Sequence, residues 1–288
     1  MYRVTMVVLL LHFTLAKKYK VAPIAIFGGL GDRSDSFGMK RYARFFSKWL
    51  ETKVKPFSLN SNKCSYVFKS MEAQWKLALE KLNEDPDFQD EFSIIGNSQG
   101  GIIARYIIQN NHLLKGRVRN LVTLGTPHMG GSKMPYWISG FLDKTVNSII
   151  KIGVYWKSIQ KFIGLSNLFR NPKNLNKFNV RAQFLNSLNN QVEFDPRIKE
   201  NYMRLNKVFL GMFKKDRMLY PKESALFGEE QPNGDVLPLT ETKLYKNDII
   251  GLKHLNEQGK LILHQFDHEH MQFSYFDLRR HVIPVLKA

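Results

Sequence analysis

The chain has 288 residues, of which 43% are hydrophobic and 24% are charged, an ordinary balance for a globular protein. This length is enough to bury a sizeable core and does not require several domains. The formal net charge is +18, but the basic residues are scattered and show neither zinc-finger spacing nor an RNA-binding aromatic motif. Nucleic acid is therefore not an expected partner, whereas peripheral contact with anionic membranes is compatible with this charge.

The amino-terminal end has the pattern of a secretory signal. Arg3 is followed by an apolar run from about Val4 to Ala16 and then by lysines. This run is shorter than the about 20 residues that a transmembrane helix needs. We therefore expect residues 1–16 to be a signal peptide and residues 17–288 to form one domain of a secretory-pathway protein, lysosomal or secreted.

Strand-like and helix-like segments alternate along most of the remaining chain. The predicted strands are residues 21–27, 53–59, 91–98, 118–124, 207–213 and 260–266. The predicted helices are residues 39–52, 70–85, 99–111 and 273–286. This alternation predicts an α/β fold with a mostly parallel central sheet and helices on both faces.

The alternation is interrupted between about residues 131 and 205. Residues 136–165 are helical and aromatic in pattern, and residues 167–191 are rich in asparagine. An insertion of this size between two strands predicts a helical cap over the carboxyl edge of the sheet, which is where open α/β sheets bind ligands.

A serine between glycines stands where the strand 91–98 gives way to a helix. The pattern Gly96-Asn97-Ser98-Gln99-Gly100 fits the G-x-S-x-G nucleophile elbow, in which the serine occupies a sharp strand-to-helix turn. Glycines two residues on either side let the strand and the helix approach closely. The backbone N–H of Gln99 would then face a developing oxyanion at the positive end of the helix. Ser98 is therefore a candidate nucleophile.

Candidate acids and bases follow Ser98 in the chain order serine, acid, histidine that such elbows use. Asp216 comes directly after the strand 207–213, whereas Asp235 lies in an Asn-Gly-Asp turn where aspartate commonly serves local hydrogen bonding. Asp216 is thus the favoured acid. His268 and His270 both lie in the loop after the last predicted strand, and position in that loop does not decide which of them is the base.

Several stretches of the chain resemble the palmitoyl-protein thioesterases. They are "GLGD" at 29–32, "GNSQGG" at 96–101, "KKDRMLYP" at 214–221, "LTETKLYKNDIIGLKHLNEQGKL" at 239–261 and "HEHMQFSYFDLRRHVIPVL" at 268–286. The tail is the most specific part, because other lipases and esterases share the elbow but not that stretch. The resemblance implies the α/β-hydrolase fold, with Ser98 as nucleophile, Asp216 as acid and His270 as base. It also implies that the backbone amides of Leu30 and Gln99 form the oxyanion hole.

The resemblance further implies cleavage of long-chain fatty acyl thioesters through an acyl-enzyme. The substrates would be palmitoyl-cysteine in proteins or peptides, and also acyl-CoA. No metal or cofactor is expected, since the histidines lack ligand spacing such as H-E-x-x-H. Two alternatives stay open: a secreted glycerolipid lipase or carboxylesterase with the same triad, suggested by "LGTPHMGG", and a catalytically inactive lipid-binding relative. His128 in that loop precedes the acid and is interpreted as a structural residue.

The insertion contains more apolar residues than one narrow helical face can hold. A stripe that packs a helix on a sheet needs three or four apolar positions per two turns. We therefore predict a second apolar surface that faces Ser98 and forms a groove for a long acyl chain. The groove candidates are Ile138, Phe141, Leu142, Ile149 and Trp156, with Val146, Ile150, Val154, Ile159, Phe162 and Ile163 in the same pattern.

Overall fold

The computed structural model describes residues 21–59, 69–133 and 153–288. The predicted signal peptide and the groove candidates Ile138, Phe141, Leu142 and Ile149 lie outside these residues. Among the described helices, none has the length and apolar character needed to cross a bilayer.

Six parallel strands form the central sheet, in the order β2-β1-β3-β4-β5-β8. Their bounds are β1 Ile24–Phe27, β2 Val54–Phe57, β3 Glu91–Asn97, β4 Arg117–Leu124, β5 Lys207–Phe213 and β8 Leu261–Phe266. All six strands lie within or within one residue of the predicted ranges, and the predicted fold class is confirmed. Near-continuous burial along β1, β3, β4 and β5 explains why these strands are apolar runs, as expected for a sheet covered on both faces.

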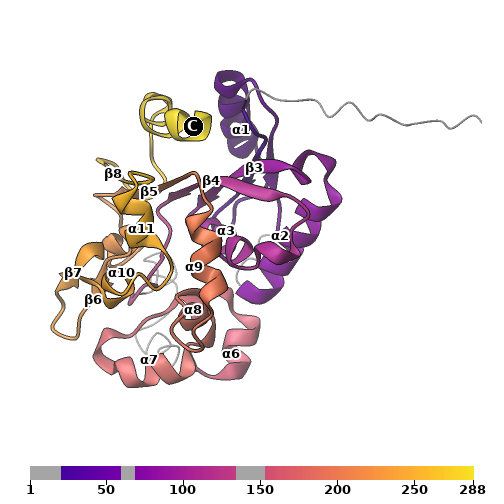
Figure 1. The fold of residues 1–288 in the computed structure, drawn as a ribbon. Helices are drawn as coiled ribbons and strands as arrows, with labels where there is room; N and C mark the ends of the chain where they lie inside the picture. The colour runs from indigo at the N-terminus through magenta and orange to yellow at the C-terminus, as the bar shows by residue number, and fades with distance from the viewer. Residues whose placement is uncertain (1–20, 60–68, 134–152) are drawn as a thin grey trace, which may run out of the picture.

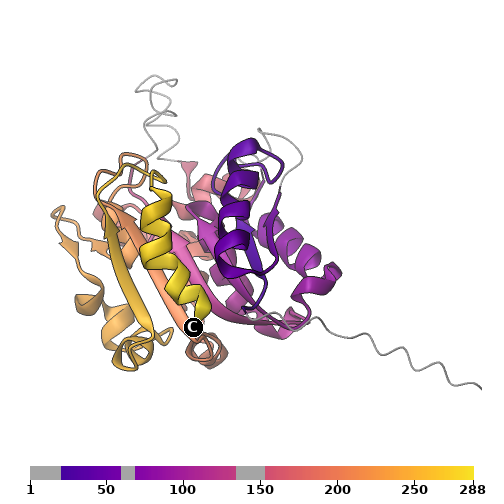
Figure 2. The same ribbon diagram turned by 90° about the horizontal axis from the view of Figure 1, so that it is seen from above.

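Helices cover both faces of this sheet. Ile24 and Ile26 of β1 point into the core under α1 (Phe37–Leu50) and the carboxyl-terminal helix, while Ala25 and Phe27 point into the core under α2 (Met71–Glu84) and α3 (Gln99–Gln109). Figure 2 shows the carboxyl-terminal helix lying beside α1. The strand alternation therefore divides the apolar side chains between two cores.

Local sequence explains how these helices begin. Ser36 and Ser70 cap α1 and α2, each accepting a hydrogen bond from the backbone N–H three residues later. The predicted helix 273–286 is interrupted. It consists of α12 (Tyr275–Asp277), a π-helical turn η8 (Leu278–Val282) and α13 (Ile283–Lys287).

The described residues 153–205, between β4 and β5, form short helical pieces. They are α6 Lys157–Phe162, η4 Gly164–Leu168, η5 Pro172–Asn174, α7 Leu175–Arg181, α8 Gln183–Leu188 and α9 Pro196–Met203. In Figure 1, α6 and α7 lie at the end of the molecule opposite to α1 and the carboxyl terminus. We call the described part of this segment, residues 153–205, the cap.

The remaining elements are short and lie in connections. They are η2 Pro86–Phe88, η3 Asn111–Leu113, η6 Lys222–Leu226, β6 Glu229–Glu230, β7 Val236–Leu237, η7 Leu239–Glu241, α10 Lys243–Lys246 and α11 Leu252–Glu257. Strands β6 and β7 pair antiparallel as a separate hairpin, which the sequence pattern did not predict.

Candidate active site

Ser98 occupies a strained turn between β3 and α3. Its backbone has φ 49° and ψ −119°, a conformation that non-glycine residues rarely adopt. The surrounding glycines are required by close approach: a Cβ on Gly96 would lie 2.4 Å from the Cα of Gly101, and one on Gly100 would lie 2.1 Å from the carbonyl oxygen of Phe27. The turn therefore presents the Ser98 side chain at the carboxyl edge of the sheet.

His270 lies between Ser98 and Asp216. Its Nε2 is 3.1 Å from Ser98 Oγ, and its Nδ1 is 2.5 Å from Asp216 Oδ2. The Asp216 side chain is 1% exposed and that of His270 is 13% exposed, so the chain of hydrogen bonds is largely shielded from water. Three side chains that are far apart in the sequence thus form one connected line.

The loops after β5 and β8 hold this geometry. Asp216 Oδ1 accepts hydrogen bonds from the backbone N–H groups of Met218 and Leu219, at 2.7 and 2.9 Å, which fixes the carboxylate. The Lys215 N–H donates to the carbonyl of His268 and ties the two loops together. Gly125, with φ 59°, leaves room for the imidazole, because a Cβ there would lie 2.9 Å from His270 Cε1.

Leu30 and Gln99 both line the cavity that Ser98 and His270 face. Gln99 is the first residue of α3, so its N–H has no acceptor within the helix. Leu30 follows Gly29, whose N–H donates to Asp32 Oδ2 at 2.7 Å and so shapes the glycine-rich loop. In the described part of the chain, Leu30 N–H forms no hydrogen bond of its own.

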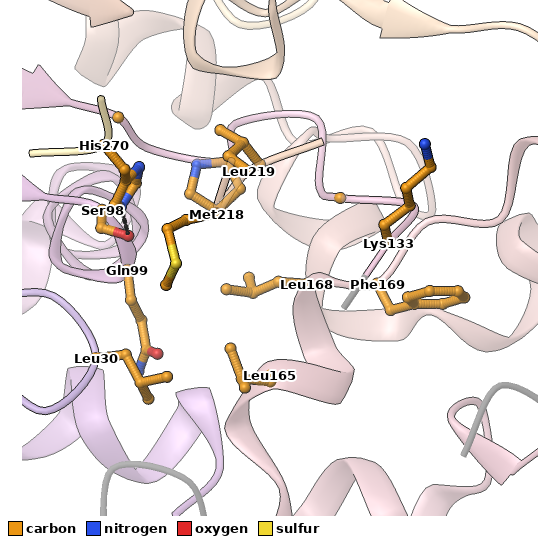
Figure 3. A pocket seen from close by; sticks show the side chains of 13 residues that line it. Leu30, Ser98, Gln99, Lys133, Leu165, Leu168, Phe169, Met218, Leu219 and His270 are labelled. Atoms are coloured by element: carbon orange, nitrogen blue, oxygen red, sulfur yellow. Dashed lines mark hydrogen bonds between the residues drawn. The ribbon is translucent and has the colours of Figure 1, made fainter. Parts of the chain in front are cut away.

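An apolar cavity of about 90 Å³ extends from these residues. Figure 3 shows Ser98 and His270 at one end, and Phe169 and Lys133 at the other. Its apolar lining comes from the glycine-rich loop, the loop after β4, the cap and the loop after Asp216, with the residues Leu30, Pro127, Leu165, Leu168, Phe169, Met218 and Leu219.

Of the predicted groove candidates, only Trp156 can be compared with the described cavity wall, because Ile138, Phe141, Leu142 and Ile149 lie outside the described residues. Trp156 is 57% exposed and is not among the described residues that line the cavity, so it faces the outside of the cap instead. Leu165, Leu168 and Phe169 from the following turn take its place. Sequence reasoning missed Met218 and Leu219, although their positions directly after Asp216 were a usable signal.

The alternative acid and base lie elsewhere. His268 is directed at Asp277, with Nε2 3.3 Å from Oδ2, and its side chain is 44% exposed. Asp235 bonds to Asn233 within the turn between β6 and β7. Loop position did not distinguish His268 from His270 as the base. In the structure, His270 is the one that lies beside Ser98.

His128 is a buried structural residue, in agreement with its interpretation from chain order. It stacks on Phe227 at 4.3 Å between ring centroids, and its Nε2 is 3.0 Å from Thr123 Oγ1. Burial lowers the pKa of His128 well below its ordinary value, and the positive charge of Arg105 adds to this effect. The imidazole is therefore neutral near neutral pH.

Within the described residues, no group of three or more His, Cys, Asp or Glu side chains is placed to hold a metal ion.

A parallel sheet with a serine on a strained strand-to-helix turn, followed by loops that bring an aspartate and a histidine to it, defines an α/β-hydrolase. The chain superposes on a putative hydrolase from Agrobacterium vitis with a TM-score of 0.52 at 13% identity, over 93% of this chain and 88% of that one. This likeness shows the fold. A family model for palmitoyl protein thioesterase matches residues 23–270, and the chain belongs to this family.

Curated relatives carry the same family name or a related one. The chain is 32% identical over 200 residues to palmitoyl-protein thioesterase 1 of Caenorhabditis elegans, covering 68% of this chain and 66% of that protein. It is 26% identical over 207 residues to a Drosophila melanogaster protein named lysosomal thioesterase PPT2 homolog, covering 70% of each. The chain thus spans just under two thirds of the worm relative's length.

Proposed function

We propose that this protein hydrolyses long-chain fatty acyl thioesters, with S-palmitoyl cysteine in proteins or peptides as the substrate class. The observation that carries the proposal is the hydrogen-bonded line from Ser98 through His270 to Asp216 beside an apolar cavity. Membership in the palmitoyl protein thioesterase family supports the choice of a thioester over an oxygen ester.

In the first half of the reaction, Ser98 Oγ attacks the thioester carbonyl carbon while His270 Nε2 takes the hydroxyl proton. Asp216 holds the ring orientation and stabilises the imidazolium. The N–H groups of Gln99 and Leu30 stabilise the negative charge on the carbonyl oxygen. The carbon–sulfur bond then breaks, the thiol leaves with the proton from His270, and an acyl-Ser98 ester remains.

In the second half, water replaces the thiol. His270 takes a proton from the water as its oxygen attacks the ester carbonyl, and the same amides stabilise the second tetrahedral intermediate. When that intermediate collapses, the proton returns to Ser98 Oγ and the fatty acid is released. The cycle needs no group beyond the chain and water.

The apolar cavity would hold the acyl chain. Leucines, a phenylalanine and a methionine line it, and each buried methylene contributes roughly 0.8 kcal/mol. On monomeric acyl-CoA substrates, kcat/KM is therefore expected to rise from short chains towards about C14 to C18. A flat profile, or a preference for acetyl and butyryl groups, would contradict an acyl-chain site.

We place the protein in the secretory pathway, as a lysosomal or secreted enzyme. The apolar run near the amino terminus supports this placement, as does the name of the Drosophila relative. Protein recovered from secretory fractions is expected to lack its first ~16 residues. An intact amino terminus on protein recovered from the cytosol would contradict the placement.

The central test compares wild type, S98A and the control S187A on a palmitoylated cysteine peptide. Ser187 is an exposed serine of α8, whereas Ser98 lies at the head of the hydrogen-bonded line. We expect S98A to lose at least about 10³-fold in kcat/KM and S187A to keep wild-type activity. Faster turnover of a triacylglycerol than of palmitoyl-CoA by the wild type would favour a lipase instead.

A further inference from the structure

The outer surface of the cap carries large apolar side chains in contact with solvent. Trp156 is 57% exposed, Phe162 is 60% exposed and Val180 is 73% exposed. Trp156 and Phe162 bracket α6, and Val180 lies near the end of α7. Scattered exposed apolar residues are ordinary on protein surfaces. Two exposed aromatic rings at the ends of one short helix, with a third exposed apolar side chain on α7, exceed such scattered exposure.

The same surface is basic. Residues 153–192 contain no aspartate or glutamate. Their exposed basic residues are Lys157, Lys161, Lys173 and Arg181. Within the described part of the chain, none of these four forms an ion pair, whereas Arg170 is buried and paired with Glu229. Among the described residues, therefore, no carboxylate is paired with the positive charge of these four side chains.

The two helices that carry most of these side chains lie against each other. The side chain of Gln160 in α6 donates to the carbonyl of Arg181 at the end of α7, at 2.9 Å, so the two helices are in direct contact. Figure 1 shows both helices at the same end of the molecule. We call the exposed residues of α6 and α7, together with Trp156 and Lys173, the cap face.

The cap face is also joined to the cavity beside Ser98. The turn η4 follows α6 directly and contributes Leu165 and Leu168 to the cavity wall. Asn167 in this turn donates to the carbonyl of Gln160 and accepts from the N–H of Met71 in α2. The outer helices and the cavity wall are thus parts of one fixed segment.

We propose that the cap face is a docking surface for an anionic lipid bilayer. Tryptophan and phenylalanine side chains insert at the level of the lipid headgroups, and lysine and arginine contact the phosphates. Aromatic rings alone would fit many partners, but their combination with uncompensated positive charge matches a surface that is both apolar and negative. Docking in this orientation places the cavity segment next to the lipid.

This inference goes beyond the proposed hydrolysis and does not depend on it. Binding can be measured with S98A, in which the proposed nucleophile is absent and the cap face is unchanged. Failure of membrane binding and failure of hydrolysis are therefore separate results.

The experiment is sedimentation of the full S98A protein with vesicles of phosphatidylcholine alone, or of phosphatidylcholine with phosphatidylserine. We expect at least about tenfold tighter binding to the anionic vesicles, and weaker binding as salt is raised, because exposed charges are screened. Equal binding to both vesicle types, or no binding to either, would overturn the proposal.

Matched variants locate the surface. Combined with S98A, K157Q/K161Q is expected to weaken anionic vesicle binding by about fivefold per lysine, whereas K48Q/K115Q removes the same charge elsewhere and should change it by less than about threefold. Lys48 and Lys115 are exposed and lie outside the cap.

The contribution of the apolar side chains to vesicle binding is tested in the same way, by comparing W156A/F162A with the control pair F37A/F276A. Phe37 at the start of α1 is 77% exposed and Phe276 in α12 is 65% exposed, and both lie outside the cap. We expect about tenfold weaker binding for the cap pair and unchanged binding for the control pair. Equal losses for test and control pairs would show attraction by net charge without a docking face. Binding to an acidic polymer such as heparin that depends on Trp156 and Phe162 as strongly as vesicle binding does would also overturn the lipid assignment.

Discussion

The parallel sheet and the cap are held together by different interactions. Strands β3, β4 and β5 are buried almost along their whole length, and the helices around them bury regularly spaced apolar side chains. The described cap helices are only six to eight residues long, and α6 buries no residue fully. Helices this short are not stable alone, so the cap must be fixed by contacts with the rest of the molecule.

Polar side chains supply many of these contacts. Arg105 of α3 is fully buried and donates to the Tyr202 hydroxyl, to the carbonyls of His128 and Leu188, and to Asn189 Oδ1. All of these acceptors are uncharged. The guanidinium thus joins the helix that begins after Ser98 to α8 and α9 of the cap.

The sheet and the cap contribute differently to the site: the sheet carries the candidate catalytic side chains, and the cap carries part of the cavity wall. Ser98, Asp216 and His270 all follow strands of the sheet, whereas Leu165, Leu168 and Phe169 come from the cap. Substitutions at the sheet edge are therefore expected to abolish the chemistry. Substitutions in the cap are expected to change stability or chain-length preference while leaving the chemistry in place.

The largest effect is expected for His270→Ala. Removal of the base leaves Ser98 with no group to take its proton, so kcat/KM should fall by about 10³-fold or more. His268→Ala is the matched control from the same loop, and it loses only a partly exposed contact with Asp277. Turnover of a palmitoylated peptide by the two folded variants checks this. The reverse ranking would move the base to His268.

The next effect concerns the link between sheet and cap. Arg105→Met removes the donor to two buried carbonyls, a hydroxyl and an amide, and each group left unpaired costs about 1–3 kcal/mol. We expect the free energy of unfolding to fall by about 3 kcal/mol or more in urea titrations. Arg181→Met, at an exposed cap position, should change it by less than about 0.5 kcal/mol. Equal stability of R105M and wild type would show that the cap is held mainly by its apolar contacts.

The sequence predicted the sheet well because its determinants are local. Apolar runs, serine caps and glycine-flanked turns are all visible within a few residues, and the serine–acid–histidine order restricts the partners of Ser98. The choice between His268 and His270 was not available from loop position, because it depends on where the loop after β8 meets the loop after β5.

The cap was predicted only as a helical insertion. Its bonds join distant residues, as Arg105 and Asn189 do across 84 positions, and no local pattern reports them. The asparagines that gave residues 167–191 a loop-like composition are largely used to cap helices and to bind buried carbonyls, as Asn174 and Asn186 show. The apolar surplus that suggested a groove at Trp156 belongs in part to the outer surface.

A smaller effect is expected in the cavity wall. Leu165→Phe adds a ring to the wall of the cavity that would hold a long acyl chain, and displacing two methylenes costs roughly 1.6 kcal/mol. We expect kcat/KM for palmitoyl-CoA to fall about tenfold while that for hexanoyl-CoA stays within about twofold. Val180→Phe adds the same ring on the outer surface of the cap and should leave the ratio unchanged. An equal loss on both substrates would place the acyl chain elsewhere.

The last prediction concerns pH, through His128 at the junction of sheet and cap. Its pKa in the folded protein is lowered by burial, so the unfolded chain binds a proton at a higher pH than the folded chain does. With an unfolded pKa of about 6.5, its contribution to stability is complete above that pH and decreases below it, by at most about 1.4 kcal/mol between about pH 7.5 and about pH 5.5. His128→Gln keeps a polar side chain near Thr123 but cannot titrate. Urea unfolding at both pH values should therefore show H128Q to be less stable than wild type at the higher pH, with a decrease on acidification that is smaller by up to about 1.4 kcal/mol. If both proteins lost the same stability on acidification, His128 would have to remain neutral in the unfolded chain or become protonated in the folded one, and the buried neutral imidazole would be wrong.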